Sequence, residues 1–234
     1  SKNIDKNTQF KTDFIAYEDL SKRNNDRFQY ILPNFTFTKR LELDRNYNGS
    51  FQFKSFGFQK NYDTNKYESL LVNDFLFESN DYINNTGLIT NYDFLIKNFN
   101  SYTENSTSYQ AKEDYEVFGV FLVKTSLPLK KVDDDSNDYL KPIASFRYSP
   151  NNTKNISNKD FRLSYDNIFA LNRIGTDEIV EGGKSISLGF EYERRNQNND
   201  KIYSLSFANS ISDRVNDNLP SKTKLNEERT DLVG

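Results

Sequence analysis

Long runs of alternating apolar and polar residues recur along the chain, and they constrain its fold more than any other feature. In the segment SISLGFEYE, the apolar residues Ile186, Leu188 and Phe190 fall on one phase, and small or charged residues fall on the other. The segments KIYSLSFANSI and DFRLSYDN alternate in the same way. A period of two is typical of a β-strand whose two faces meet different surroundings. The sequence therefore predicts an all-β protein.

The predicted strands are long. We expect about ten of them, near residues 8–19, 28–43, 50–60, 67–80, 87–101, 116–128, 139–149, 161–171, 185–195 and 201–213. Strands of globular proteins average about five or six residues, whereas a tilted membrane-spanning strand needs about nine to eleven. Segments rich in Asn, Asp and Gly separate the strands and indicate turns between neighbours. We therefore predict an antiparallel meander that is a partial segment of a large transmembrane β-barrel.

The alternation itself leaves two environments open. In a soluble sandwich, one face packs on a core and the other meets water, whereas in a large barrel one face meets lipid and the other a wet lumen. Aromatic residues near strand ends would form an interfacial girdle in a membrane or pack at a rim in a soluble protein: Tyr17, Tyr30, Tyr102, Tyr148 and Tyr192. Strand length leads us to favour the membrane.

Composition excludes several kinds of site. The chain has no His and no Cys, so Ser-His-Asp and Cys-His nucleophile arrangements cannot form, nor can zinc sites built on thiolate or imidazole. Its net charge is -3 with acids and bases interleaved, which argues against a nucleic-acid partner. We expect no enzyme activity and no cofactor. No signal peptide is visible at Ser1, and a fragment or a mature chain would both begin in this way.

One charged, glycine-punctuated segment, DNIFALNRIGTDEIVEGG, lies between two predicted strands. It could be a solvated loop, a catalytic cluster or the signature of one particular kind of barrel, and we interpret it as a folded loop that crosses between two wall strands. The carboxylates of Asp177, Glu178 and Glu181 suggest either a glycosidase pair or loop salt bridges, and we favour salt bridges. We expect Arg173 and Glu181 to hold the loop. Gly182-Gly183 would then supply positive-φ turns and a close backbone approach.

A set of short motifs in and around this segment resembles a known protein family. The motifs are KP at 141–142, RYSPN at 147–151, NIF at 167–169 followed by NR, EGG at 181–183 with SLGFEY, and LP through TDLVG at 219–234. In combination they resemble the C-terminal barrel domain of the LPS-assembly protein family LptD, also called OstA or Imp. Upstream, FQYILPNFTFTK, NYDTNKYESLLVNDFLFES and TSLPLKK resemble further strands and a hairpin of that domain. The resemblance covers most of the chain.

The resemblance implies an integral β-barrel in the outer membrane of a Gram-negative cell, which inserts lipopolysaccharide into the outer leaflet. It implies three partners: lipopolysaccharide, an LptE-like plug lipoprotein, and a periplasmic Lpt bridge that would act through an N-terminal domain. Residues 1–234 would be a single segment of the barrel, without that family's N-terminal jelly-roll and its terminal gate strands. The alternatives are another outer-membrane barrel, either porin-like or an enzyme, and a secreted carbohydrate-binding β-sandwich.

The candidate site residues are expected to contact lipopolysaccharide in the lumen or to anchor the loop. They are Arg147, Arg162, Asn167, Arg173, Glu181, Gly182 and Gly183. The three arginines fall on or just beyond the polar phase of predicted strands. Such a guanidinium could bind phosphate bidentately or pair with Glu181, Glu191 or Glu193.

Overall fold

The structure is a computed structural model that describes residues 2–21, 27–43, 48–62, 66–106, 113–176 and 178–234. It is all-β, with 63% of the described residues in strands and 1% in helix. No helix in the described ranges is long and apolar enough to cross a membrane. The predicted fold class, an antiparallel meander of long strands, is confirmed.

The strands follow one another along the sheet almost in chain order. They are β1 (Lys2–Asp5), β2 (Thr8–Glu18), β3 (Phe28–Glu42), β4 (Gly49–Tyr62), β5 (Tyr67–Ser79), β6 (Tyr82–Ile83), β7 (Ile89–Glu104), β8 (Glu113–Ser126), β9 (Leu129–Val132), β10 (Ser136–Ser149), β11 (Gly183–Asn196) and β12 (Lys201–Ser212), and a short 3₁₀ helix, η1, spans Lys222–Lys224. The order is β1-β2-β3-β4-β5-β7-β8-β10-β11-β12, with β6 beside β7 and β9 beside β10. The sheet is not closed.

One predicted strand is wrong. Residues 161–171 form turns rather than a strand, because β10 pairs directly with β11 over its whole length, from Ser136↔Asn196 to Ser149↔Gly183. No place remains between these two strands for another one. The charged segment therefore does not join a strand at 161–171 to the strand that follows it, as the sequence predicts. It belongs to one long connection, residues 150–182, that leaves the sheet after β10 and returns at β11.

The chain divides into two compact units, and the first contains Ser1–Phe77 and Leu95–Phe118. In this unit β3 pairs with β4 from Gln29↔Tyr62 to Glu42↔Ser50, with an irregularity between Ile31 and Asn34. One face of the sheet buries Val72, Phe99 and Phe118 together with an ion pair, in which Lys97 Nζ lies 2.6 Å from Asp74 Oδ1. The first unit thus mixes apolar and paired charged side chains on one face.

The second unit contains Glu78–Phe94 and Gly119–Gly234, and the two faces of its strands β10–β12 differ sharply. Large apolar side chains are exposed on one face: Leu140, Phe146, Tyr148, Ile186, Leu188, Tyr203, Leu205 and Ile211. The opposite face holds a row of buried serines, with Ser145 paired to Ser187 and Ser187 to Ser210. Apolar side chains face outward and polar side chains are buried, which is the reverse of a soluble sheet.

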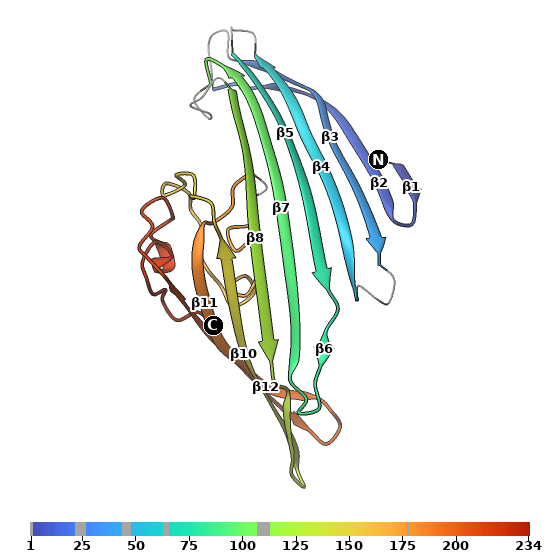
Figure 1. The fold of residues 1–234 in the computed structure, drawn as a ribbon, viewed down its shortest axis with the longest axis vertical. Coiled ribbons are helices and arrows are strands. Elements are labelled where there is room, and N and C mark those ends of the chain that lie inside the picture. Colours follow the sequence, from blue (N-terminus) through green and yellow to red (C-terminus); the bar gives the residue numbers. More distant parts are fainter. Residues whose placement is uncertain (1, 22–26, 44–47, 63–65, 107–112, 177) are drawn as a thin grey trace. The chain divides into compact units, whose positions relative to one another are not determined.

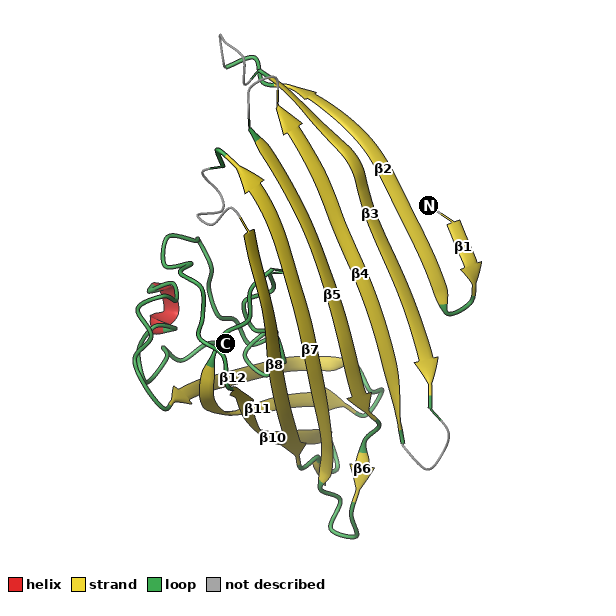
Figure 2. Cartoon of the chain, turned by 45° about the horizontal axis from the view of Figure 1, so that its top comes forward, coloured by secondary structure: helices red, strands yellow, loops and turns green. Residues whose placement is uncertain are grey.

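Two segments of chain cover the serine face (Figures 1 and 2). The 150–182 connection and the 213–234 tail pack on each other and on Ala208 through a shared core of Ile156, Leu163, Ile168, Ile174, Leu219, Leu225 and Val233. The tail also follows the outer edge of β12, where the backbone groups of Ala208 and Val233 exchange hydrogen bonds of 2.8 and 2.9 Å. Apolar residues that alternate like a strand, such as Phe161 and Leu163, serve this core instead of the sheet.

Candidate functional site: a buried arginine–glutamate network

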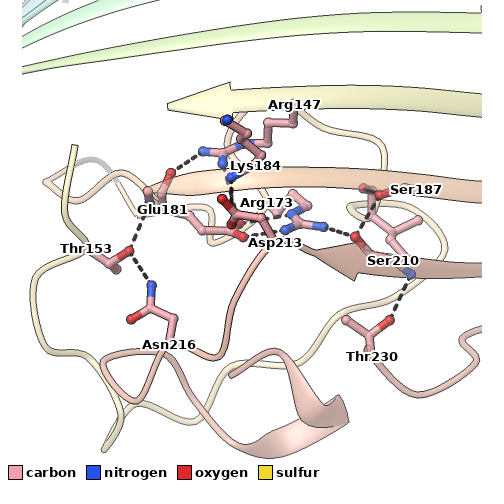
Figure 3. A network of polar contacts seen from close by, with 12 residues as sticks. Arg147, Thr153, Arg173, Glu181, Lys184, Ser187, Ser210, Asp213, Asn216 and Thr230 are labelled. Carbon is pink, nitrogen blue, oxygen red and sulfur yellow. Dashed lines mark hydrogen bonds and ion pairs between the residues drawn. The ribbon is translucent and has the colours of Figure 1, made fainter. Parts of the chain in front are cut away.

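A buried ion pair lies where the 150–182 connection meets the sheet (Figure 3). Arg173 binds the Glu181 carboxylate with two nitrogens: Nε donates to Oε2 at 2.9 Å and Nη2 donates to Oε1. Its remaining nitrogen, Nη1, donates to Ser210 Oγ on β12 at 2.6 Å. The Arg173 side chain is 1% exposed and that of Glu181 is 4% exposed. The pair therefore fixes the connection to the sheet from inside the protein.

Arg147 approaches the same carboxylate from β10. Its Nη1 lies 3.9 Å from Glu181 Oε2, and its other nitrogens donate to backbone carbonyls, Nε to Leu171 O at 2.8 Å and Nη2 to Glu181 O at 2.7 Å. One strand residue thus holds the connection at two points ten residues apart in sequence. Because its donors are used by the chain itself, Arg147 acts here as an anchor for the loop.

Two buried cations share one buried anion in this network. Burial raises the pKa of the Glu181 carboxyl, but the charges of Arg173 and Arg147 and the hydrogen bonds from Arg173 outweigh it and hold that pKa below its ordinary value. Glu181 is therefore ionised at neutral pH. The stability of an ion pair that is buried away from water depends on the geometry of its hydrogen bonds. Removing one member of such a pair leaves an uncompensated buried charge.

The serine row lets the connection and the tail approach the sheet closely. Ser187 Oγ lies 3.0 Å from Ser210 Oγ and 3.2 Å from the carbonyl oxygen of Ile168, to which it can donate. The backbone N–H of Ser210 donates to Thr230 Oγ1 at 3.0 Å. Small hydroxyl side chains leave room for a covering segment and satisfy its polar groups, which larger residues on this face would not do.

A second junction surrounds Gly182. Its N–H donates to Thr153 Oγ1 at 2.9 Å, and Asn216 Nδ2 from the tail donates to the same oxygen at 2.9 Å. A Cβ at Gly182 would lie 1.8 Å from the backbone oxygen of Asn151, so only glycine fits. Gly183 has φ +98°, a conformation that other residues rarely adopt. The two glycines are thus required for different reasons: Gly182 allows a close backbone approach, and Gly183 adopts a left-handed conformation.

The structure separates the remaining predicted residues from this network. Arg162 is exposed, and it lies in the connection instead of on a strand. Asn167 stabilises a local turn, since its Oδ1 accepts from Ser164 N at 2.9 Å and its Nδ2 donates to Arg162 O at 3.3 Å. Arg147, Arg173, Glu181 and Gly182 are brought together. Asp177 lies outside the described residues.

Sequence reasoning missed the partners that arrive from distant segments. Ser187 and Ser210 were visible as small residues on a polar phase, and this smallness was a signal that something packs against them. Thr153, Asn216 and Thr230 gave no signal, because their roles depend on the tail folding back over the connection. Among the described residues, no group of three or more His, Cys, Asp or Glu is arranged to hold a metal ion.

Comparison with known proteins gives no family: no family model matches the chain, and no curated protein matches it. The fold and the network define the class of protein. The chain is an all-β antiparallel meander whose second unit exposes an apolar face and covers its polar face with its own connection and tail.

Proposed function

We propose that this chain is part of the wall of a β-barrel in the outer membrane of a Gram-negative cell. The observation that carries the proposal is the exposed apolar face of β10–β12. Its side chains form continuous rows across three strands, such as Phe146↔Ile186↔Ile211 and Leu140↔Tyr192↔Leu205. A contiguous exposed apolar surface of this kind marks contact with a membrane or another protein.

The opposite face supports the membrane over a protein core. In a β-sandwich, the apolar face of one sheet packs on a second sheet, yet the described strands all belong to one sheet. The covered face carries serines and the Arg147–Glu181–Arg173 network, which suits the polar interior of a barrel. An alternation of apolar outside and polar inside is the arrangement that lipid requires of a barrel wall.

Within this class we propose lipopolysaccharide assembly of the LptD type, on the strength of the sequence motifs. Three of these motifs, RYSPN, NIF followed by NR, and EGG, contain residues of the buried network or of the turns beside it. A motif that maintains a folded connection over the polar face fits a barrel whose interior must be shaped for a large amphiphile. Transport of this kind makes and breaks no covalent bond, so no catalytic residue is assigned.

The network also narrows the choice of arginine that would contact lipopolysaccharide. Arg147 and Arg173 are buried and engage Glu181, so their donors are committed to the fold. Arg162 is exposed at the surface of the connection and is the candidate for contact with a lipopolysaccharide phosphate. A plug lipoprotein and a periplasmic bridge are proposed as partners of the parent protein.

Depletion of the parent protein in its native cell tests this function. We expect newly made lipopolysaccharide to accumulate on the periplasmic side of the outer membrane, where reagents applied to intact cells cannot reach it. Normal delivery of lipopolysaccharide to the cell surface after depletion would refute the assembly function. A protein recovered in the soluble fraction without detergent would refute the membrane assignment as well.

A further inference from the structure

A cavity of about 610 Å³ lies on the covered face of β10–β12 in the second unit. Its polar lining comes from adjacent strands: Tyr139 and Lys141 on β10, Glu191 and Glu193 on β11, and Ser204 on β12. The ring of Tyr165, from the 150–182 connection, forms one wall. A volume of this size is within the usual range of about 300–1,000 Å³ for small-molecule sites. The covering connection thus borders an open hollow that the buried network does not fill.

A second hollow of about 270 Å³ adjoins the first. It shares Lys141, Tyr165 and Glu191 with the larger cavity and adds Lys124 and Asp166. Lys141 Nζ lies 3.3 Å from Glu191 Oε2, and both side chains are partly exposed, at 40% and 44%. The pair therefore stands at the junction of the two hollows, with donors and acceptors still open to a ligand. The ring of Tyr165 is held by an edge-on contact with Phe169, at 5.7 Å between centroids.

The charges around the two hollows balance. Lys124, Lys141 and Arg195 supply the basic groups, and Asp166, Glu191 and Glu193 supply the acidic ones. Arg195 pairs with Glu193, whose other oxygen lies 3.3 Å from Lys201 Nζ. A free phosphate or a polyanion would meet carboxylates as often as ammonium groups, so the lining does not favour an anion.

We propose that these hollows form a saccharide-binding site centred on the Lys141–Glu191 pair. Each sugar hydroxyl donates one hydrogen bond and accepts others, so a ligand with many hydroxyls matches a lining that alternates ammonium donors, carboxylate acceptors and serine hydroxyls. The ring of Tyr165 gives apolar surface for a C–H face of the sugar. The inference deepens the proposed function, on which it rests for the source of the ligand: the carbohydrate part of the transported glycolipid.

Binding to oligosaccharides in the absence of lipid tests the site. The full chain is purified in lauryldimethylamine oxide, because the headgroup of a maltoside detergent is itself a disaccharide and would compete. Retention on an array of immobilised neutral and acidic oligosaccharides selects a probe, and calorimetry then measures its affinity beside that of inorganic phosphate. We expect Glu191→Gln to weaken oligosaccharide binding at least about tenfold, since a charged acceptor is lost. Lys141→Gln is expected to act in the same direction.

Glu178→Gln is the matched control, because it makes the same change at a carboxylate of the same unit that lines neither hollow. Its affinity for the oligosaccharide should equal that of the unaltered chain. The proposal is overturned if no oligosaccharide is retained, if Glu191→Gln and Lys141→Gln leave binding unchanged, or if phosphate binds in place of sugar. A chain that inserts into membranes yet binds no sugar would overturn this inference alone and leave the proposed membrane function intact.

Discussion

Replacing Glu181 by glutamine should release the 150–182 connection from the sheet. Glutamine keeps the shape of the side chain but leaves Arg147 and Arg173 buried without an anion, and Arg173 loses the carboxylate that binds two of its nitrogens. Removing one member of a buried ion pair typically costs about 3–5 kcal/mol. A loss of about 3 kcal/mol raises the population of the open connection on the order of a hundredfold.

Chymotrypsin can report this opening. Its targets in the connection include Leu163, which is 4% exposed, and Phe161, Tyr165 and Phe169, which pack on the same core. When opening and closing are fast relative to cleavage, the cleavage rate follows the open population. The rate in Glu181→Gln should therefore rise on the order of a hundredfold, while Glu178→Gln should match the unaltered chain. Cleavage of Glu181→Gln within twofold of the unaltered chain would show that the ion pair does not hold the connection.

Three further outcomes follow from the same contacts. Gly182→Ala should destabilise the connection by about 1–3 kcal/mol or more in a denaturant titration, because its Cβ would overlap the Asn151 carbonyl oxygen, whereas Gly119→Ala, with nothing within 4 Å, should change little. Leu225→Ala, at a side chain 1% exposed in the shared core, should cost about 2–5 kcal/mol in the same measurement, and a cost under about 0.5 kcal/mol would contradict the role of the tail. Because the pKa of Glu181 is lowered on folding, its stabilisation is complete above the unfolded pKa of about 4.3 and is lost as pH falls through the folded value. Amide hydrogen exchange in the connection, corrected for intrinsic rates, should therefore accelerate as the pH falls below about 4.3. In Glu181→Gln, the acceleration that comes from protonation of Glu181 should be absent.

The strands could be predicted because their side chains alternate over enough residues to define two faces. SISLGFEYE is confirmed as a strand, and it lies in β11, where Ile186 and Leu188 are exposed while Ser187 is buried. DFRLSYDN alternates equally well, yet its Phe161 and Leu163 pack into a loop core. Local alternation does not distinguish the two cases, because the pairing of β10 with β11 decides whether the sheet has room for another strand.

The site could be predicted only where its partners are near in sequence. Arg173 and Glu181 are eight residues apart within one charged segment, and the structure places them in contact. Ser210 and Thr230 reach the network through β12 and the tail, and their positions depend on long-range folding. Arg162 was predicted on the polar face of a strand, but the structure has no strand there and leaves Arg162 exposed on the connection.

Spin-label accessibility can show whether the exposed apolar face of β10–β12 contacts lipid. The chain contains no cysteine, so single substitutions such as Leu188→Cys on the apolar face and Ser204→Cys on the polar face can each carry one label. In reconstituted bilayers, the label at position 188 should relax with lipid-soluble oxygen, and the label at position 204 should relax with a water-soluble nickel chelate. Equal access of the nickel chelate to both positions would contradict the account.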